Sequence, residues 1–358
     1  MYPLLVVARA LTEGHSDVEI LYVGHAEGLE ASIVARADLP FRTVDAGPIR
    51  GATPLAVARS LQQLWRGYRQ ARALCAEWSA DVVATTGSYV SVPVALAAKR
   101  AGVPVLVYLP DLEPGLAVRL QAHFADRVAV SFDDVCRHFP ARKVWVSGYP
   151  VRAEILEADR VSAHRILGLP NARRTLLGFG GSRGARAVNQ ALVEILPDLL
   201  TEYQVIHISG ELDWPWVDEH QRTLDPELRC WYHAYPYLHG ERLAAAFAAS
   251  DLAVARAGAA TMAEFPAVGL PSVLVPYPYS GQHQRLNAEF MVRHGAAVCI
   301  DNADLPQQLK PTVLRLLADQ STLAQMSERA RALARPRAAQ DLAAALVRLG
   351  GSVGGGSA

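Results

Sequence analysis

The sequence predicts an α/β protein with two doubly wound parallel-sheet domains that face each other across a cleft. Three observations support this. Short apolar runs alternate with helix-period segments, the alternation restarts after "VSGYPVR" near Gly148, and 358 residues suffice for two complete cores. Strands that alternate with helices form parallel sheets covered on both faces. We place the domains at residues 1–150 and 151–349, followed by a flexible tail at 350–358.

The first domain opens on a helical pattern rather than on a strand. Four apolar residues share one helical face before Gly14 ends the pattern: Leu4, Leu5, Ala8 and Leu11. Strands are expected at "VEILYVG", "DVVATTG", "VPVLVYLP" and "RVAVSF", with a helix over residues 55–78. A doubly wound domain normally opens with a buried strand, so this sheet is expected to lack its first strand.

The second domain has a more regular pattern. Strands are expected at "RTLLGFG", "YQVIHISG", "DLAVARAG" and "PSVLVPYP", and a helix over residues 188–200 follows the first of them. Glycine-rich or polar segments follow three of these strands. Because ligands of doubly wound sheets bind beyond the carboxyl ends of the strands, we expect the binding site there, in the cleft between the domains.

Composition excludes several classes of partner. Lys and Arg number 35, as do Asp and Glu, so the formal charge is zero and nothing indicates a nucleic-acid partner. No apolar run reaches the roughly 18 residues that a membrane span needs. The four cysteines lack metal-binding spacing and are interpreted as reduced thiols. The cysteines therefore indicate no metal site.

The segment "GFGGSRGARAVNQ" predicts an anion site at a strand-to-helix turn. Bare glycine backbone lets amides approach an anion, and the following helix directs the positive end of its dipole at the turn. The residues involved are Gly180, Gly181, Ser182, Arg183 and Gly184, and Arg186 adds a second positive charge. Phosphate or diphosphate suits such a turn. The alternative interpretation is a tight structural turn without a ligand.

Two further clusters favour a nucleotide sugar. "ARAGAATMAEF" places Glu264 in a helix after a second glycine turn, where a carboxylate can accept hydrogen bonds from a ribose diol. "PYPYSGQHQRLNA" carries His283 and Gln284 in an amide-rich segment, and amides both donate to and accept from sugar hydroxyls. The alternative for Glu264 is a solvated helix residue. Diphosphate, ribose and hexose would then occupy three successive strand ends.

Together these segments resemble the MurG family of N-acetylglucosaminyltransferases, which belongs to glycosyltransferase family 28 and makes lipid II in peptidoglycan synthesis. The resemblance rests on the three motifs above and on "GPIRG" and "TGSYVSVPVALAAKRAGVPVLV" in the first half. It implies two Rossmann-like domains of the GT-B type. It also implies inverting transfer of N-acetylglucosamine from UDP-GlcNAc to a lipid-linked acceptor, with neither a metal nor another cofactor, and the sequence has no Asp-x-Asp pair placed to carry a metal.

The resemblance also implies residue roles. The glycine turn at residues 180–184 would hold the diphosphate, and Arg152 would approach the nucleotide. Glu264 would bind the ribose. The remaining donor contacts would come from the backbone of Tyr237 and Leu238 at the uracil, the amides of Ala259 and Ala260, and the side chains of His283 and Gln284 at the sugar.

The sequence departs from the family in three places. It begins where the family has passed its glycine-rich loop and the histidine that is its general base, so we expect the reading frame to extend upstream. Asp111 stands where the family has asparagine, close to Glu113, and we take Asp111 as a candidate base. Pro266 is expected to interrupt the helix that carries Glu264; the alternative is that it lies in the first helical turn, which tolerates proline.

The helix over residues 55–78 is a candidate membrane surface. Its candidate contacts are Leu61, Leu64, Trp65, Arg66 and Arg69, an apolar stripe flanked by basic residues. We therefore expect a cytoplasmic protein bound peripherally to the inner leaflet of the cell membrane. The alternative is an ordinary helix that packs on its own sheet.

Other functions stay open at this point. The same fold could use a different donor or acceptor, which the acidic loop at Asp111 favours. The chain could instead only bind the nucleotide sugar, since the acceptor loop is not in the sequence. A doubly wound oxidoreductase fits poorly, because it needs a complete dinucleotide fingerprint.

Overall fold

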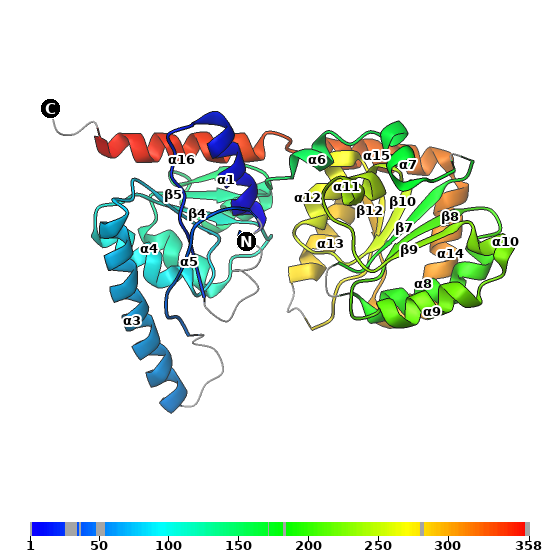
Figure 1. The fold of residues 1–358 in the computed structure, drawn as a ribbon, viewed down its shortest axis with the longest axis horizontal. Coiled ribbons are helices and arrows are strands. Elements are labelled where there is room, and N and C mark those ends of the chain that lie inside the picture. Colours follow the sequence, from blue (N-terminus) through cyan, green and yellow to red (C-terminus); the bar gives the residue numbers. More distant parts are fainter. Residues whose placement is uncertain are drawn as a thin grey trace. The chain divides into compact units, whose positions relative to one another are not determined.

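The computed structural model describes residues 2–25, 34–35, 37–47, 54–170, 172–181, 184–279 and 283–354. The chain forms two compact units, each built on parallel strands (Figure 1). One comprises Met1–Pro150 and Arg337–Ala358, and the other Val151–Pro336. The division between Pro150 and Val151 lies where the sequence places its domain boundary. The α/β class predicted from the sequence is confirmed.

The first unit contains two groups of parallel strands. Its helices are α1 (Tyr2–Gly14), α3 (Pro54–Glu77), α4 (Ser91–Arg100), α5 (Leu116–Phe124) and α16 (Ala338–Gly354), with a 3₁₀ turn at Asp133–His138. Strands β1 (Tyr22–Gly24) and β2 (Phe41–Thr43) form one pair, and β3 (Val83–Thr85), β4 (Val105–Leu109), β5 (Arg127–Val130) and β6 (Val144–Val146) form a four-stranded sheet in that order. Within the described residues these two groups of strands are not hydrogen-bonded to each other.

The C-terminal helix corrects the predicted domain boundaries. Residues 337–349 were assigned to the second domain, yet α16 packs in the first unit against α1 and β4, where Leu342 and Leu346 join Val7 and Leu106 in one apolar cluster. The chain returns to the first unit because this apolar face needs a partner. The helix also continues to Gly354, so residues 350–354 are not the flexible tail expected; residues 355–358 lie outside the described residues.

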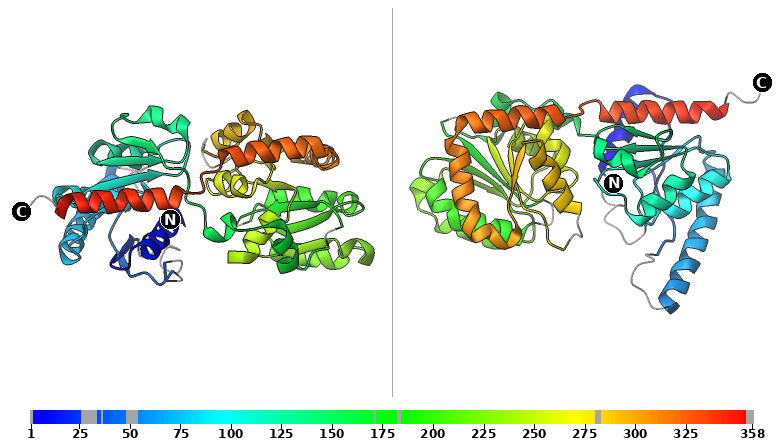
Figure 2. Two further views of the ribbon diagram at one scale, coloured as in Figure 1. Left: turned by 90° about the horizontal axis from the view of Figure 1, so that it is seen from above. Right: turned by 180° about the vertical axis from the view of Figure 1, so that it is seen from behind.

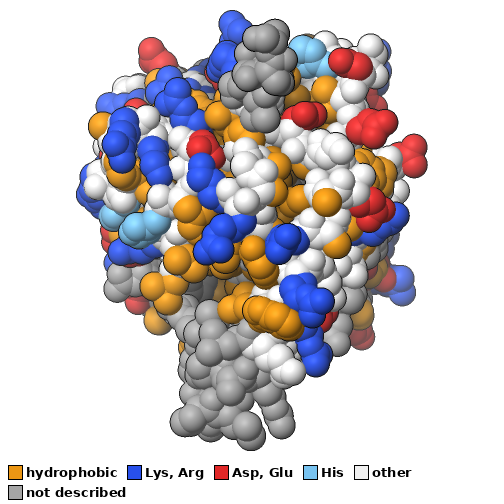
Figure 3. Space-filling model, turned by 90° about the vertical axis from the view of Figure 1, so that its left-hand side faces the viewer, with side chains coloured by type: hydrophobic (Ala, Val, Ile, Leu, Met, Phe, Trp, Pro, Cys, Tyr) orange, Lys and Arg blue, Asp and Glu red, His pale blue; other side chains and the backbone are white. Residues whose placement is uncertain are grey.

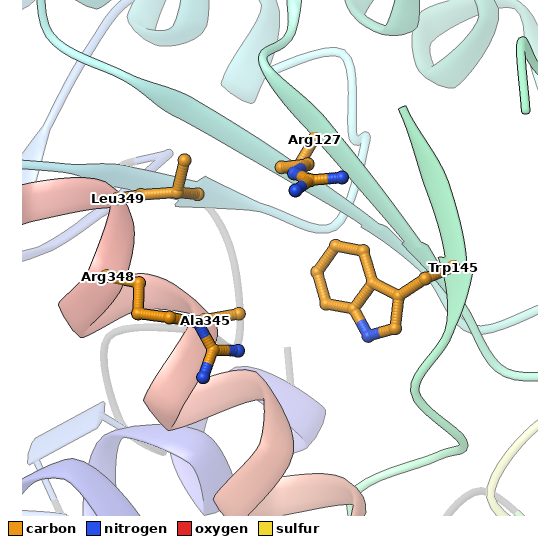
Figure 4. Close-up of a pocket in the computed structure, with 5 residues that line it drawn as sticks. All are labelled: Arg127, Trp145, Ala345, Arg348 and Leu349. Atoms are coloured by element: carbon orange, nitrogen blue, oxygen red, sulfur yellow. The ribbon is translucent and has the colours of Figure 1, made fainter. Parts of the chain in front are cut away.

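A pocket of about 470 Å³ opens between α16 and the sheet of the first unit (Figure 4). Arg127 on β5 and Trp145 on β6 line one side, and Ala345, Arg348 and Leu349 of α16 line the other. Because both walls come from this unit, the pocket further shows that α16 is part of it.

The second unit is a single parallel sheet with helices on both faces (Figure 2). Its strands are β7 (Thr175–Phe179), β8 (Gln204–Ile208), β9 (Tyr232–Tyr235), β10 (Leu252–Ala255), β11 (Ser272–Leu274) and β12 (Ala297–Cys299). Its helices are α6 (Ala153–Leu156), α7 (Arg160–Leu167), α8 (Arg186–Leu199), α9 (Trp214–Thr223), α10 (Pro226–Arg229), α11 (Gly240–Ala248), α12 (Thr261–Val268), α13 (His283–Arg293), α14 (Leu305–Ala318) and α15 (Gln320–Leu333), with a 3₁₀ turn at Asn302–Asp304.

The strand order β12-β11-β10-β7-β8-β9 fixes where this sheet can bind a ligand. From β7 the chain adds β8 and β9 on one side, then crosses over and adds β10, β11 and β12 on the other. The order therefore reverses between β7 and β10, and the crevice at such a switch point is the usual ligand site. The core holds β7 rigid there: Leu192 and Leu196 of α8 pack with Leu176 and Val205 in one buried cluster.

Candidate functional site

The two glycine turns predicted from the sequence lie side by side at the switch point of the second sheet. Strand β7 ends at Phe179 and β10 ends at Ala255, and these two residues are paired in register. The first turn therefore starts beside the second, and each leads into a helix, α8 or α12. This adjacency carries the assignment of a binding site to this edge of the sheet.

Two backbone amides of the first glycine turn donate hydrogen bonds within the protein. The amide of Gly180 donates to the carbonyl of Ile208 at 3.0 Å, and that of Gly184 donates to Gly181 at 3.1 Å. These two amides, which the sequence predicts to approach an anion, therefore donate within the protein instead. The amides of residues 185–188, at the start of α8, make no hydrogen bond within the described residues. Ser182 and Arg183 lie outside the described residues.

Close packing explains the glycines of this turn. Gly181 and Gly184 have φ of 72° and 78°, in the left-handed region that favours glycine. A Cβ at Gly184 would lie 2.7 Å from the carbonyl oxygen of Ser209, and one at Gly180 would lie 3.0 Å from the same atom. The turn thus packs directly against the backbone that follows β8. This packing accounts for Gly180 and Gly184 without a ligand, as in the alternative interpretation of a tight structural turn. Gly181 alone faces open space.

The second turn leaves its amides open. The amides of Ala259 and Ala260 make no hydrogen bond within the described residues, and α12 has no side-chain cap. The helix runs through Pro266 to Val268, so the expectation that Pro266 interrupts it is wrong. The amide of Glu264 donates to Ala260 at 2.8 Å and fixes the first turn ahead of the proline. Because proline removes only one helical donor, the helix tolerates it here.

Arg152 and Glu264, which are distant in sequence, form an ion pair at this site. Arg152 Nη2 donates to Glu264 Oε1 at 2.9 Å, and the side chains are 28% and 10% exposed. Burial raises the pKa of the Glu264 carboxyl, and the Arg152 guanidinium opposes that rise. Burial lowers the pKa of Arg152, but Glu264, with smaller contributions from Tyr237 and Glu154, raises it, and the net pKa is raised. Glu264 is therefore not the solvated helix residue of the alternative interpretation.

Tyr237 and Leu238 follow β9 in the same unit. Tyr237 makes a small contribution that raises the pKa of Arg152. The Tyr237 ring lies tilted against the His239 ring at 59°, with centroids 4.4 Å apart, and Leu238 is buried. The uracil contacts of Tyr237 and Leu238 stay predictions.

The loop after β11 is tied to the second turn. Arg256 donates to the carbonyl of Val275 at 3.2 Å, and Asn287 Nδ2 donates to the carbonyl of Ala257 at 2.9 Å. Gln284 Oε1 accepts from the amide of Tyr277 at 2.9 Å, so this side chain orders its own loop. His283 is exposed at the start of α13. The sugar-reading roles of His283 and Gln284 stay predictions.

Asp111 lies in the first unit, in the loop after β4. It is half-buried and helps to raise the pKa of Tyr108, for which burial is the main cause. Nearby Glu113 lies 3.9 Å from Arg119 Nη2. The role of Asp111 as a base stays a prediction. Within the described ranges no three His, Cys, Asp or Glu side chains come together as metal ligands would.

A buried polar network beside the first turn was not predicted from the sequence. Asn189 Nδ2 donates to the Ser209 carbonyl and to Asp213 Oδ2, both at 2.8 Å. Asn189 Oδ1 then accepts from His207 Nε2 at 3.0 Å, which leaves His207 Nδ1 to accept from the Tyr232 hydroxyl at 2.6 Å. Polar residues inside otherwise apolar helix and strand patterns were the signal that could have revealed it. Arg186, assigned to the ligand, instead pairs with Asp213.

His207 predicts a pH dependence of stability. Burial lowers its pKa to about 3, whereas an unfolded chain has a value of about 6.5. The unfolded chain therefore gains a proton that the native unit does not, and stability falls as pH falls. Between pH 6.5 and 4 we expect His207 to contribute a loss of about 1.4 kcal/mol per pH unit.

Unfolding of the wild type and of His207→Gln, measured across this pH range, tests the expectation. The variant should show the shallower acid slope, while His239→Gln, which changes an exposed imidazole, should retain the wild-type slope. Equal slopes in the wild type and His207→Gln would contradict it.

The two parallel-sheet units, each compact by itself, define a protein with two Rossmann-like domains. Residues 1–130 match the model of the glycosyltransferase family 28 N-terminal domain, and residues 175–342 match that of the C-terminal domain. The chain belongs to glycosyltransferase family 28 and is a hexosyltransferase.

Two curated relatives bear the name UDP-N-acetylglucosamine–N-acetylmuramyl-(pentapeptide) pyrophosphoryl-undecaprenol N-acetylglucosamine transferase. The protein of Roseiflexus sp. is 40% identical over 96% of this chain and 91% of its own length. That of Bacillus subtilis is 33% identical over 98% and 96%. Among solved structures, MurG of Acinetobacter baumannii has a TM-score of 0.77 at 23% identity, covering 97% of this chain and 95% of its own, which shows the shared fold.

Proposed function

We propose that this chain transfers N-acetylglucosamine from UDP-GlcNAc to a lipid-linked acceptor, the step from lipid I to lipid II in peptidoglycan synthesis. The names of the relatives support this donor and acceptor. The assignment of UDP-GlcNAc as the donor rests on one observation. Two glycine turns lie side by side at the switch point, with Arg152 and Glu264 in contact beside them.

The proposed reaction inverts the anomeric centre. The acceptor hydroxyl attacks the anomeric carbon, the bond to the diphosphate oxygen breaks, and UDP departs with the bonding electrons. Negative charge grows on the diphosphate in the transition state. Open amides and the dipole at the start of α8 would stabilise that charge more than they stabilise the ground state, which is how such a site accelerates transfer. We propose that no metal is needed.

A second candidate function is transfer to a different acceptor. Asp111 would repel a lipid-linked diphosphate, and this favours an acceptor with less negative charge. Arg119 makes this loop less acidic, because its Nη2 lies 3.9 Å from the Glu113 carboxylate and offsets part of the charge.

Titration with UDP-GlcNAc, followed by turnover with a lipid-linked acceptor, tests both candidates. We expect UDP-GlcNAc to bind more tightly than UDP-glucose, and UDP release to depend on the lipid acceptor. No binding of UDP-GlcNAc would overturn the donor assignment. Donor binding without turnover on the lipid, but with turnover on an uncharged glycoside acceptor, would favour the second candidate.

We further propose that α3 contacts the inner leaflet of the membrane. No described helix is both long enough and apolar enough to cross a bilayer. Trp65 is 59% exposed, and the Arg69 guanidinium lies 5.0 Å from its ring centroid. Basic side chains lie among hydrophobic ones on the face shown in Figure 3. Amphipathic surfaces of this composition bind anionic lipid. The side chain of Leu61 lies outside the described residues.

The opposite side of α3 packs as an ordinary helix does. Tyr68 and Ala71 join an apolar cluster with Val90 and Ala97, and Leu64 is half-buried. The alternative interpretation is therefore correct for this face, and the membrane proposal concerns Trp65, Arg66 and Arg69.

Arg69→Gln is expected to weaken binding to vesicles that contain anionic lipid by about 1 kcal/mol, or roughly fivefold, since one basic charge is lost near the surface. Vesicle sedimentation measures it, with Arg315→Gln, an exposed arginine of the second unit, as the matched control. Equal binding by the wild type and Arg69→Gln, or binding insensitive to salt, would contradict the proposal.

A further inference from the structure

A buried carboxylate lies beside the first glycine turn. The Asp213 side chain is only 4% exposed, directly ahead of α9. Its Oδ1 accepts from Arg186 Nε and, at 3.2 Å, from Trp216 Nε1, while its Oδ2 accepts from Asn189 Nδ2 at 2.8 Å. A buried charge requires donors of this kind, and here three are present.

The Asp213 carboxylate joins the first turn of α8 to the turn after β8. Arg186 and Asn189 stand three residues apart, on one face of α8, and both donate to it. Asn189 also donates to the carbonyl of Ser209, and the amide of Asp213 donates to Gly210 at 3.2 Å. One carboxylate thereby connects these two segments.

The carboxylate also borders the glycine turn itself. A Cβ at Gly184 would lie 3.3 Å from Asp213 Oδ2, so Asp213 forms one wall of that turn. Helix α8 has no side-chain cap at its start. The orientation of its open amides therefore depends on what holds Arg186 and Asn189, and Asp213 contacts both.

The hydrogen bonds on the other side of Asn189 fix the orientation of its side-chain amide. His207 and Tyr232, from β8 and β9, complete a chain that runs from the Tyr232 hydroxyl through His207 to Asn189 Oδ1. Asn189 can then present only its amino group to Asp213 and Ser209. The sheet interior thus dictates which atom of Asn189 meets the carboxylate.

We propose that Asp213 is a positioning residue, whose carboxylate fixes the first turn of α8 so that the open amides there hold the donor diphosphate. This rests on the proposed function, which assigns the diphosphate to this turn. Asp213 contributes no attraction of its own, because its charge is negative. Arg186 offsets that charge, so Arg186 serves the turn rather than the ligand.

Asp213→Asn tests the proposal with two ligands that differ only in the diphosphate. The variant keeps the shape, but its amino group must face one of the three donors, so the turn shifts. We expect the dissociation constant for UDP to rise about tenfold, as a displacement of about 1 Å from productive geometry can readily cause. That for uridine should stay unchanged. Calorimetry measures UDP, and displacement titration measures uridine.

Asp198→Asn is the matched control, because Asp198 also belongs to α8 but is half-exposed and pairs with Lys310 at 2.6 Å. It should change neither constant. A purely structural role for Asp213 would lower thermal stability and leave the ratio of UDP to uridine affinity unchanged, and that result would overturn the proposal. A parallel loss of both affinities would overturn it as well.

Trp216→Phe is used if Asp213→Asn does not fold, since it removes one donor to the carboxylate and keeps an aromatic ring. A lowered ratio of UDP to uridine affinity supports the proposal, and an unchanged ratio overturns it. If wild-type protein binds UDP no more tightly than uridine, the diphosphate assignment of the proposed function fails, and the Asp213 role fails with it. Tight UDP binding with an unaffected variant overturns the Asp213 role alone.

Discussion

Glu264→Gln is expected to weaken the binding of UDP by about 1–3 kcal/mol, the cost of losing hydrogen bonds to a charged group. Glu264 is buried and paired with Arg152 at 2.9 Å, so its carboxylate is held in one orientation beside the second glycine turn. If it accepts from the ribose hydroxyls, glutamine replaces two good acceptors by one. The loss of the ion pair is moderate, because Arg152 is 28% exposed and water reaches it.

A second ligand separates the ribose contact from the ion pair. UDP and 2′,3′-dideoxy-UDP are titrated into the wild type and Glu264→Gln. A contact between Glu264 and the ribose makes the two losses non-additive, with the dideoxy ligand binding almost equally to both proteins. Glu289→Gln is the control, since Glu289 is 50% exposed and pairs with Arg285 at 3.0 Å. Additive losses would remove Glu264 from the ribose site.

The interior strands could be predicted from the sequence, and most edge strands could not. All eight predicted runs contain an observed strand, among them β4, β7, β8 and β10, which are mainly apolar and buried. The strands β2, β6, β9 and β12 were not predicted, and each lies at an edge of its sheet. An edge strand is partly exposed, so it needs no apolar run, as the segment "YHAY" of β9 illustrates.

Part of the candidate site could likewise be predicted from the sequence, and part of it could not. Glycine turns after strands and Glu264 carry local sequence signals, and the structure places them at one switch point. Contacts between distant residues leave no local pattern: Arg152 meets Glu264 across 112 positions, and Asn189 meets Asp213 across 24. The assignment of α16 failed for the same reason, because an amphipathic helix does not specify which apolar surface it will cover.

Gly210→Ala is expected to destabilise the second unit by about 2–5 kcal/mol, combining backbone strain with overpacking. Gly210 has φ of 83°, and a Cβ there would overlap the backbone nitrogen of Gly184 and lie 2.5 Å from its Cα. Backbone atoms cannot rotate away as a flexible side chain can. The two turns must therefore separate, which also displaces the open amides at the start of α8.

Gly168→Ala isolates the contribution of the contact between the turns. Gly168 belongs to the same unit and has φ of 64°, but a Cβ there meets nothing within 4 Å. This control carries only the left-handed strain, about 1–2 kcal/mol. Hydrogen exchange of the β7 and β8 amides reports the stability of this unit separately from the other. If both variants lose the same hydrogen-exchange protection, the two turns separate without loss of stability. Their contact then does not fix the position of the first glycine turn. A larger loss in Gly210→Ala, together with weaker UDP binding, would show that the position of the first glycine turn depends on the backbone behind it.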